Sequence, residues 1–225
     1  MIYLIRHGQA SFLKSDYDKL SDLGVRQSKI LGESLKDRKQ LTSVIVRGDL
    51  VRHQETMEHC LKAFGHNIEG VIDHRWNEYD HMELLAKHNA EFSDHVAIGE
   101  YLKKQDHPMR ALQESLNVSI MDWIDNKHSY SISWSTFKEG VWTALHDISN
   151  QLSKGENAWI FSSGGPISAV LIQLLSLKDE QFVELQGRLV NCSITKVIVG
   201  KKRLSLSTYN EYSHLDHHPD LITYR

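Results

Sequence analysis

The chain has 225 residues, 40% of them hydrophobic, with 26 basic residues against 29 acidic ones. This length predicts one globular unit that can bury roughly 70% of its unfolded surface in a single core. The net charge of −3 provides no basic surface that neutralises many phosphates at once, so we expect no nucleic-acid partner. The sequence has no long apolar run, and we expect no membrane partner.

Cysteine and histidine usage adds two observations. Cys60 and Cys192 are the only cysteines, too few for a disulfide framework, and the first residues lack the three regions of a signal peptide. These features predict a reducing, cytoplasmic location. Histidine is unusually frequent, at 14 residues, and this excess calls for an explanation.

The first 72 residues alternate short apolar runs with amphipathic stretches. We predict strands at 2–5, 43–46 and 68–72 and helices at 21–38 and 50–64. Ser21 or Asp22 is suited to cap the first helix. The resulting βαβαβ order predicts a parallel sheet with helices on its faces.

The rest of the chain contains one interruption of this pattern. Residues 82–132 are polar, rich in His and Lys and broken by Pro108, so we predict a helical insertion or cap over the sheet. The pattern then resumes with helices at 137–152 and 167–175, a strand at 158–161 between them, and a hairpin of strands 193–199 and 204–209 at the sheet edge. We therefore predict one α/β domain over residues 1–225, a three-layer α/β/α sandwich with a mostly parallel sheet.

A polar motif follows the first predicted strand directly. Arg6, His7, Gly8 and Gln9 would lie at the carboxyl edge of a parallel sheet, where open α/β folds bind ligands. Three or four residues alone are a weak signal, since a histidine here could be an ordinary hydrogen-bonded turn residue. Other motifs in the chain decide between the two interpretations.

These other motifs occur in a fixed order along nearly the whole chain. They are the segment 20–24 (LSDLG), the segment 48–52 (GDLVR), Asn77-Glu78-Tyr79, Ser163-Gly164-Gly165, Asn191-Cys192-Ser193 and the tail elements from Asn210 to Leu215. With the motif at residues 6–9, this order resembles the histidine phosphatase superfamily, which includes cofactor-dependent phosphoglycerate mutases and many small phosphatases. The resemblance implies a phosphoglycerate mutase-like fold.

The resemblance also implies roles for individual residues. His7 matches the nucleophile that takes the phosphoryl group, and Glu78 matches the proton donor, which needs a raised pKa to be protonated near pH 7. Arg6 and Arg52 match the pair whose forked donors grip phosphate oxygens. The remaining predicted phosphate-binding residues are Gln9, Ser163 and Gly164. No metal and no cofactor is required, because arginines and helix amides supply the positive charge.

Ser163 is a departure from the resembled pattern. Most members of the superfamily carry a second histidine there, which hydrogen-bonds the transferring phosphoryl group. A serine offers only a neutral hydrogen bond, a difference of about 1–2 kcal/mol or roughly tenfold in rate. His53 or His146 could support the pocket instead. If the serine is merely a weaker donor, Ser163→His should raise turnover.

From these features we predict a metal-independent phosphoric monoester hydrolase of the histidine acid phosphatase type, acting through a phosphohistidine on a small phosphorylated metabolite. The alternatives are a phosphoglycerate-type mutase and a catalytically impaired regulatory protein that binds phosphate compounds. The C-terminal cluster His214, Asp216, His217 and His218 has metal-ligand residue types but irregular spacing, so we expect a polar tail. The sequence leaves open the substrate and whether the chain forms a homodimer.

Overall fold

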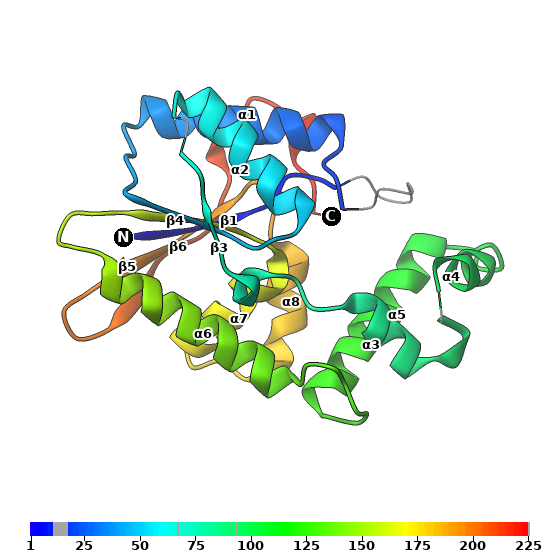
Figure 1. Cartoon of the computed structure of the whole chain (residues 1–225). Helices are drawn as coiled ribbons and strands as arrows, with labels where there is room; N and C mark the ends of the chain where they lie inside the picture. Colours follow the sequence, from blue (N-terminus) through cyan, green and yellow to red (C-terminus); the bar gives the residue numbers. More distant parts are fainter. Residues whose placement is uncertain (11–17, 67, 93, 225) are drawn as a thin grey trace.

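The protein is described by a computed structural model covering residues 1–10, 18–66, 68–92 and 94–224. Its strands are β1 (Ile2–Arg6), β2 (Val44–Arg47), β3 (Val71–Ile72), β4 (Ala158–Ser162), β5 (Ile194–Val199) and β6 (Leu204–Glu211). They form one sheet in the order β3-β2-β4-β1-β5-β6 (Figure 1).

Strand directions agree with a mostly parallel sheet. β1, β2, β3 and β4 run parallel, whereas β5 pairs antiparallel with β1 and then with β6. The predicted hairpin at the sheet edge is therefore confirmed. The predicted strand at 68–72 is wrong in extent, because only Val71 and Ile72 pair with β2, and both side chains are exposed at the opposite edge.

Helices cover both faces of the sheet, which confirms the predicted three-layer arrangement. They are α1 (Asp22–Asp37), α2 (Val51–Phe64), α3 (His81–His88), α4 (His95–Leu102), α5 (Pro108–Ile124), α6 (Trp134–Gln151), α7 (Gly164–Leu174) and α8 (Phe182–Arg188). In Figure 1, α1 and α2 lie above the sheet, and α6, α7 and α8 lie below it. Short 3₁₀ helices span 74–76, 90–92, 179–181, 213–215 and 219–221.

Side-chain alternation in the central strands separates the two faces. Tyr3 and Ile5 of β1 pack in the cluster that contains residues of α1 and α2, whereas Ile2 and Leu4 pack in the cluster formed with α6 and α7. This period of two is the geometry of an extended strand buried on both sides. The core of the molecule is therefore two apolar layers divided by the sheet.

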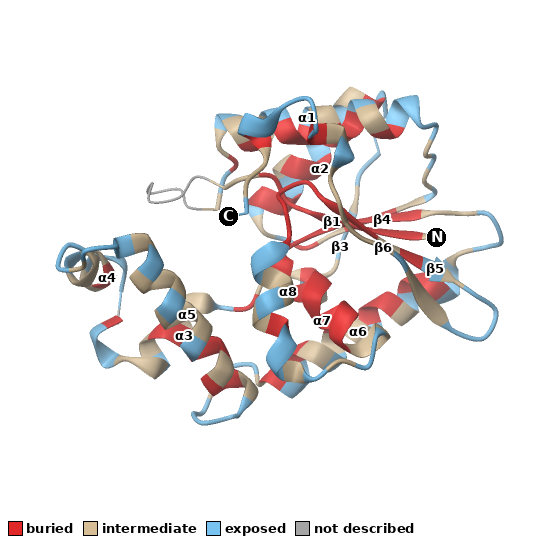
Figure 2. Cartoon of the chain, turned by 180° about the vertical axis from the view of Figure 1, so that it is seen from behind, coloured by how far each residue is buried: buried red, intermediate tan, exposed pale blue. Residues whose placement is uncertain are grey.

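α7 is buried more completely than the other helices around it (Figure 2). Every residue from Gly164 to Ile172 is buried, and the helix lies between the sheet and α6 and α8. An apolar helix without a polar face is typical of a protein interior. Its N-terminus, which directly follows β4, is thereby held in a defined position at the carboxyl edge of the sheet.

The range predicted as an insertion is occupied largely by helices. α3, α4 and α5 project beside the sheet, on the side of its carboxyl ends (Figure 1). Leu85, Phe92 and Ile98 form a small apolar cluster of their own there. Across the described parts of the chain, no helix combines the length and apolar character needed to span a bilayer.

Two helical glycines provide a matched test of the packing. A Cβ at Gly32 of α1 would overlap the Cys60 carbonyl oxygen of α2, whereas a Cβ at Gly140 of α6 would meet nothing within 4 Å. We expect Gly140→Ala to raise the free energy of unfolding by about 0.5–1 kcal/mol, because alanine favours the helix. Gly32→Ala should lower it by about 1–3 kcal/mol despite the same propensity gain.

Urea denaturation of both variants measures this difference. Equal stabilisation by the two substitutions would contradict the close approach of α1 and α2.

Candidate active site

Parallel pairing of β1 with β4 brings the two central motifs together. Arg6 lies opposite Ser162 in the register, and the His7 amide donates to the Ser162 carbonyl at 2.9 Å. The motif after β1 and the glycine turn after β4 therefore meet at one sheet edge, as predicted. A cavity of about 870 Å³ opens there, a size typical of small-molecule sites.

His7 is held as a neutral imidazole with one nitrogen available. Its Nδ1 lies 2.7 Å from the Gly8 carbonyl, which can only accept, so Nδ1 carries the proton and Nε2 keeps its lone pair. Burial, with the nearby Arg52 and Arg6, lowers the pKa of His7 well below its usual value. The side chain lines the cavity and has the state that a nitrogen nucleophile needs.

The loop that carries His7 is fixed by close backbone packing. A Cβ at Gly8 would lie 2.6 Å from the Gly24 carbonyl oxygen, and a Cβ at Gly24 would overlap the Gln9 carbonyl oxygen. The Gly8 amide also donates to Thr56 Oγ1 of α2 at 3.0 Å. Neither position 8 nor position 24 has room for a side chain, which explains why both residues are glycine.

Arg6 is a buried cation with a free donor. Its Nη1 donates to the Leu189 carbonyl, while its Nε has no hydrogen-bond partner among the described residues. Burial lowers the pKa of Arg6 to about 10, so the guanidinium remains charged at pH 7. A buried, unpaired donor is costly unless an acceptor binds it, which is what a phosphate oxygen would do.

Arg52 comes from the first turn of α2 and lines the same cavity. Its Nη1 donates to Asp18 at 2.5 Å, and the other oxygen of that carboxylate accepts the Val51 amide at 2.7 Å. Asp18 therefore caps the start of α2 and orients the guanidinium. The sequence motifs did not indicate this role, since Asp18 lies outside all of them.

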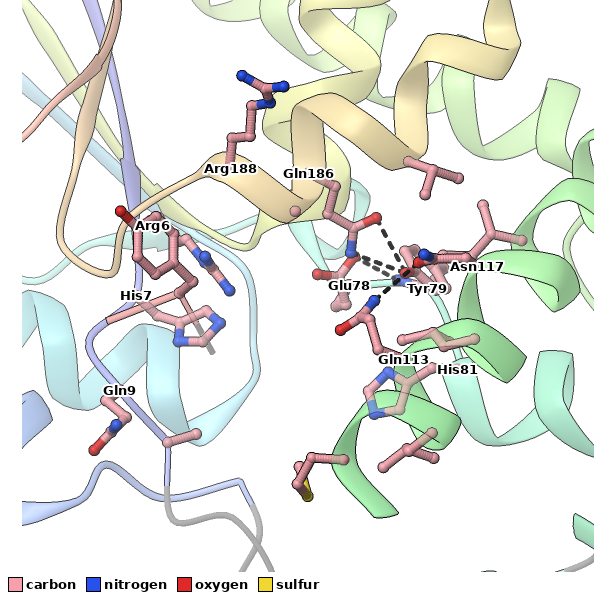
Figure 3. Close-up of a pocket in the computed structure, with 18 of the residues that line it drawn as sticks. Arg6, His7, Gln9, Glu78, Tyr79, His81, Gln113, Asn117, Gln186 and Arg188 are labelled. Atoms are coloured by element: carbon pink, nitrogen blue, oxygen red, sulfur yellow. Dashed lines mark hydrogen bonds between the residues drawn. The ribbon is translucent and has the colours of Figure 1, made fainter. Parts of the chain in front are cut away.

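Glu78 lines the same cavity and lies across it from His7 (Figure 3). Its carboxylate accepts the Gly165 amide of α7 at 3.2 Å, and a Cβ at position 165 would overlap Glu78 Oε1. Burial raises the pKa of Glu78, although Arg52 and the Gly165 amide act in the opposite direction. The predicted proton donor thus has a raised pKa and lies in the same cavity as the predicted nucleophile.

The other predicted phosphate ligands differ in their access to the cavity. Gln9 lines it, and its Oε1 accepts from Ser21 Oγ at 2.9 Å, which leaves its amide donors for a ligand. Ser163 and Gly164 are buried and are not among the residues that line the cavity. Their predicted phosphate contact therefore remains a prediction.

Ser163 is paired with a second buried histidine. Its Oγ lies 2.6 Å from His53 Nε2, and the His53 ring centre lies 5.8 Å from that of His7. His53 Nδ1 has no partner among the described residues, which favours a proton on Nε2 and donation to the serine. His146, the other predicted supporter, packs instead on Trp142 of α6.

The far wall of the cavity comes from α3, α5 and α8. Figure 3 shows Gln113, Asn117 and His81 across the cavity from His7, and Tyr79 hydrogen-bonded to Gln186. Sequence patterns did not single out these wall residues. The regular spacing of residues 109, 112, 113, 116, 117 and 120 on one helix is the signal that could have found them.

The C-terminal histidine cluster shows no metal-site geometry. Within the described ranges, no three His, Cys, Asp or Glu side chains come together in a way that could hold a metal ion. His217 and His218 are exposed. Burial lowers the pKa of His214 to about 4, so this residue is neutral at pH 7.

Comparison with known proteins identifies the family. The family model of the histidine phosphatase superfamily (branch 1) matches residues 2–212, and the chain belongs to this superfamily. It is 26% identical over 200 residues to a 2,3-bisphosphoglycerate-dependent phosphoglycerate mutase of Mesorhizobium japonicum, covering 82% of this chain and 86% of that protein.

Solved structures share the fold at lower identity. A phosphoserine phosphatase variant from Entamoeba histolytica, in complex with phosphoserine, has a TM-score of 0.65 at 18% identity, over 95% of this chain and 98% of that one. A phosphoglycerate mutase from Bacillus anthracis has a TM-score of 0.63 at 18% identity, over 96% and 94%. The same fold thus carries both a phosphatase and a mutase.

The contact between His53 and Ser163 changes the expectation for Ser163→His. A histidine at position 163 would need space that the His53 ring occupies next to this fully buried serine. We expect Ser163→His alone to lower both turnover and stability, the latter by about 1–3 kcal/mol from overpacking. The double variant His53→Ala/Ser163→His should recover most of both losses, because a small residue at 53 makes room for the new imidazole.

A double-mutant cycle on kcat and on the free energy of unfolding measures this coupling. Additive effects of the two substitutions would contradict it.

Proposed function

We propose that this protein is a phosphomonoester phosphatase that acts through a phosphohistidine at His7, without a metal, on a small phosphorylated metabolite. One observation carries the proposal: a neutral His7 with a free Nε2 lies beside two arginines and faces a carboxyl group with a raised pKa. Membership of a superfamily that includes phosphatases and mutases supports it.

In the proposed first step, His7 Nε2 attacks phosphorus while the bond to the ester oxygen breaks. Arg6 and Arg52 hold the phosphoryl oxygens and offset their charge, which supplies much of the catalysis in phosphoryl transfer. Protonated Glu78 gives its proton to the departing oxygen, so an alcohol leaves rather than an alkoxide. The Nδ1 hydrogen bond to Gly8 keeps the ring oriented throughout.

In the second step, water attacks the phosphohistidine. The Glu78 carboxylate now accepts a proton from the water as the new oxygen–phosphorus bond forms and the nitrogen–phosphorus bond breaks. Inorganic phosphate leaves, and His7 and the protonated Glu78 are restored. A mutase would transfer the phosphoryl group back to an alcohol at this point instead of to water.

The first test is hydrolysis of a chromogenic phosphomonoester in the presence of a metal chelator. We expect turnover by the wild type and a loss on the order of 10³-fold or more in His7→Ala, since positioned nucleophilic attack is removed. The exposed His217→Ala is the matched control and should leave the rate unchanged.

Acid-labile labelling of His7 with phosphate would support the intermediate. Hydrolysis that survives His7→Ala would overturn the proposal, as would inactivity of the wild type at every pH. Phosphoryl transfer between phosphoglycerates without release of phosphate would identify the mutase alternative.

The roles of Glu78 predict a dependence on pH and on the leaving group. The lowered pKa of His7 keeps it neutral well below pH 6.5, whereas Glu78 loses its proton as pH rises through its raised pKa. Alcohol release from alkyl phosphates should therefore fall on the alkaline side. In single turnovers, Glu78→Gln should slow this step by roughly 10²–10⁴-fold for alkyl esters and far less for p-nitrophenyl phosphate, which needs no proton.

Stopped-flow measurement of the released alcohol checks this prediction. Equal slowing of both esters would show that Glu78 does not donate the proton.

A further inference from the structure

The wall of the cavity opposite His7 is one face of α5. Met109, Leu112, Leu116 and Ile120 lie along that face, with Gln113 and Asn117 beside them. Their spacing of three and four residues places them in a stripe about 16 Å long, from the rise of 1.5 Å per residue. At one end of the stripe, Ile120 belongs to the same apolar cluster as Tyr79, the neighbour of Glu78.

Three of these apolar side chains are only half-buried. Met109, Leu112 and Leu116 have intermediate exposure and border the cavity, whereas Ile120 is fully packed. Apolar surface of this kind gains free energy when a ligand removes it from water. The Gln113 side-chain amide donates to Asn117 Oδ1 at 2.9 Å. This leaves the Gln113 carbonyl oxygen and the Asn117 amide NH₂ to contact a neutral polar group.

Three arginines bring positive charge to the described part of the cavity, two of them at the phosphate-binding end and the third, Arg188, on α8. The lining cations are Arg6, Arg52 and Arg188, and Arg188 forms an ion pair with Glu184 at 2.6 Å. His81 on α3 lines the far side, where burial lowers its pKa to about 4 and leaves it neutral at pH 7. α5 contributes no charged side chain to the cavity.

From this geometry we infer that the substrate is a monophosphate ester of an uncharged, largely apolar alcohol, whose hydrocarbon part lies along the α5 face. The inference rests on the proposed function for the position of the phosphoryl group, which Arg6, Arg52 and His7 hold. A second phosphate or a carboxylate on the part of the substrate along α5 would lie against leucines and neutral amides, and α5 offers it no opposite charge to offset the loss of hydration. A neutral chain replaces water on the same surface without that cost.

The test is a series of alkyl monophosphates with ethyl, butyl, hexyl and octyl groups, compared with 3-phosphoglycerate. Leaving-group basicity is nearly constant in the series, so kcat/KM reports binding of the chain. Each methylene that becomes fully buried contributes roughly fourfold. We expect a rise of at least tenfold from ethyl to hexyl phosphate, and 3-phosphoglycerate to fall below hexyl phosphate.

Leu112→Gln and Val118→Gln are matched variants on α5. Leu112 borders the cavity, whereas Val118 is exposed and does not line it. The first should flatten the chain-length dependence several-fold, and the second should leave the whole series unchanged. An effect of equal size in both variants would assign the change to helix stability instead of to the wall.

Binding of the matching alkylphosphonates, measured by calorimetry, separates this inference from the proposed function, because their carbon–phosphorus bond is not hydrolysed. Affinity that rises with chain length while no ester is turned over would uphold the substrate class and overturn the phosphatase. Hydrolysis without chain-length dependence, or with a preference for 3-phosphoglycerate, would overturn the substrate class and uphold the phosphatase.

Discussion

The end of β4 is the part of the structure on which the active site depends. Ser162 accepts the His7 amide through its carbonyl, and its hydroxyl donates to the Trp76 carbonyl at 2.7 Å, next to the segment that bears Glu78. One residue further along, Ser163 pairs with His53, and the Gly165 amide then holds the Glu78 carboxylate. The short stretch 162–165 therefore contacts the loop of His7, the Glu78 carboxylate and α2. A slip of one position in the β1–β4 pairing would move His7 away from Ser162 and so separate the nucleophile from the contacts that residues 162–165 make with His53 and Glu78.

Burial and nearby charges set the protonation behaviour of His7 and Glu78. Burial disfavours the charged form of both His7 and Glu78, which keeps the histidine nucleophilic and the carboxyl protonated to higher pH. The arginines lower the pKa of both groups, so they reinforce burial at His7 and oppose it at Glu78. The carboxyl ends with a raised pKa because desolvation is the larger effect. The site thus combines two cations with a neutral histidine and a carboxyl group whose pKa is raised.

The central strands and the placement of the main site residues could be predicted from the sequence. The strands 2–5 and 158–161 are short apolar runs, and buried parallel strands allow little else. Arg6 ends β1, His7 follows it, and Arg52 lies in the first turn of the helix after β2, so all three were expected at the carboxyl edge of the sheet. Position in the chain and residue type were sufficient for these predictions.

The remaining features depend on side-chain geometry that a linear pattern does not contain. The pairing of Asp18 with Arg52 joins residues on separate segments, and the contact of His53 with Ser163 joins a helix to a strand end. The strand predicted at 68–72 is longer than β3, because only Val71 and Ile72 pair with β2. Ile68, the other large apolar residue of that range, is exposed and lies outside the strand. The wall formed by α5 depends on how a polar, helical segment packs beside the sheet.

The α5 wall and the proposed reacting groups belong to different parts of the fold, which bears on how substrate selectivity evolves. Of the groups proposed to break the ester bond, Arg6 and His7 lie at the end of β1, Arg52 at the start of α2 and Glu78 in the segment before α3. The surface proposed to contact the alcohol belongs to α5, whose neighbours are mainly other parts of the projecting helices. Under the proposed function, substitutions on this face of α5 would change selectivity for the alcohol while the reacting groups stay in place. Under the proposed function, laboratory evolution aimed at new esters would start from the cavity-lining positions of α5 and leave the strand ends of the core unchanged.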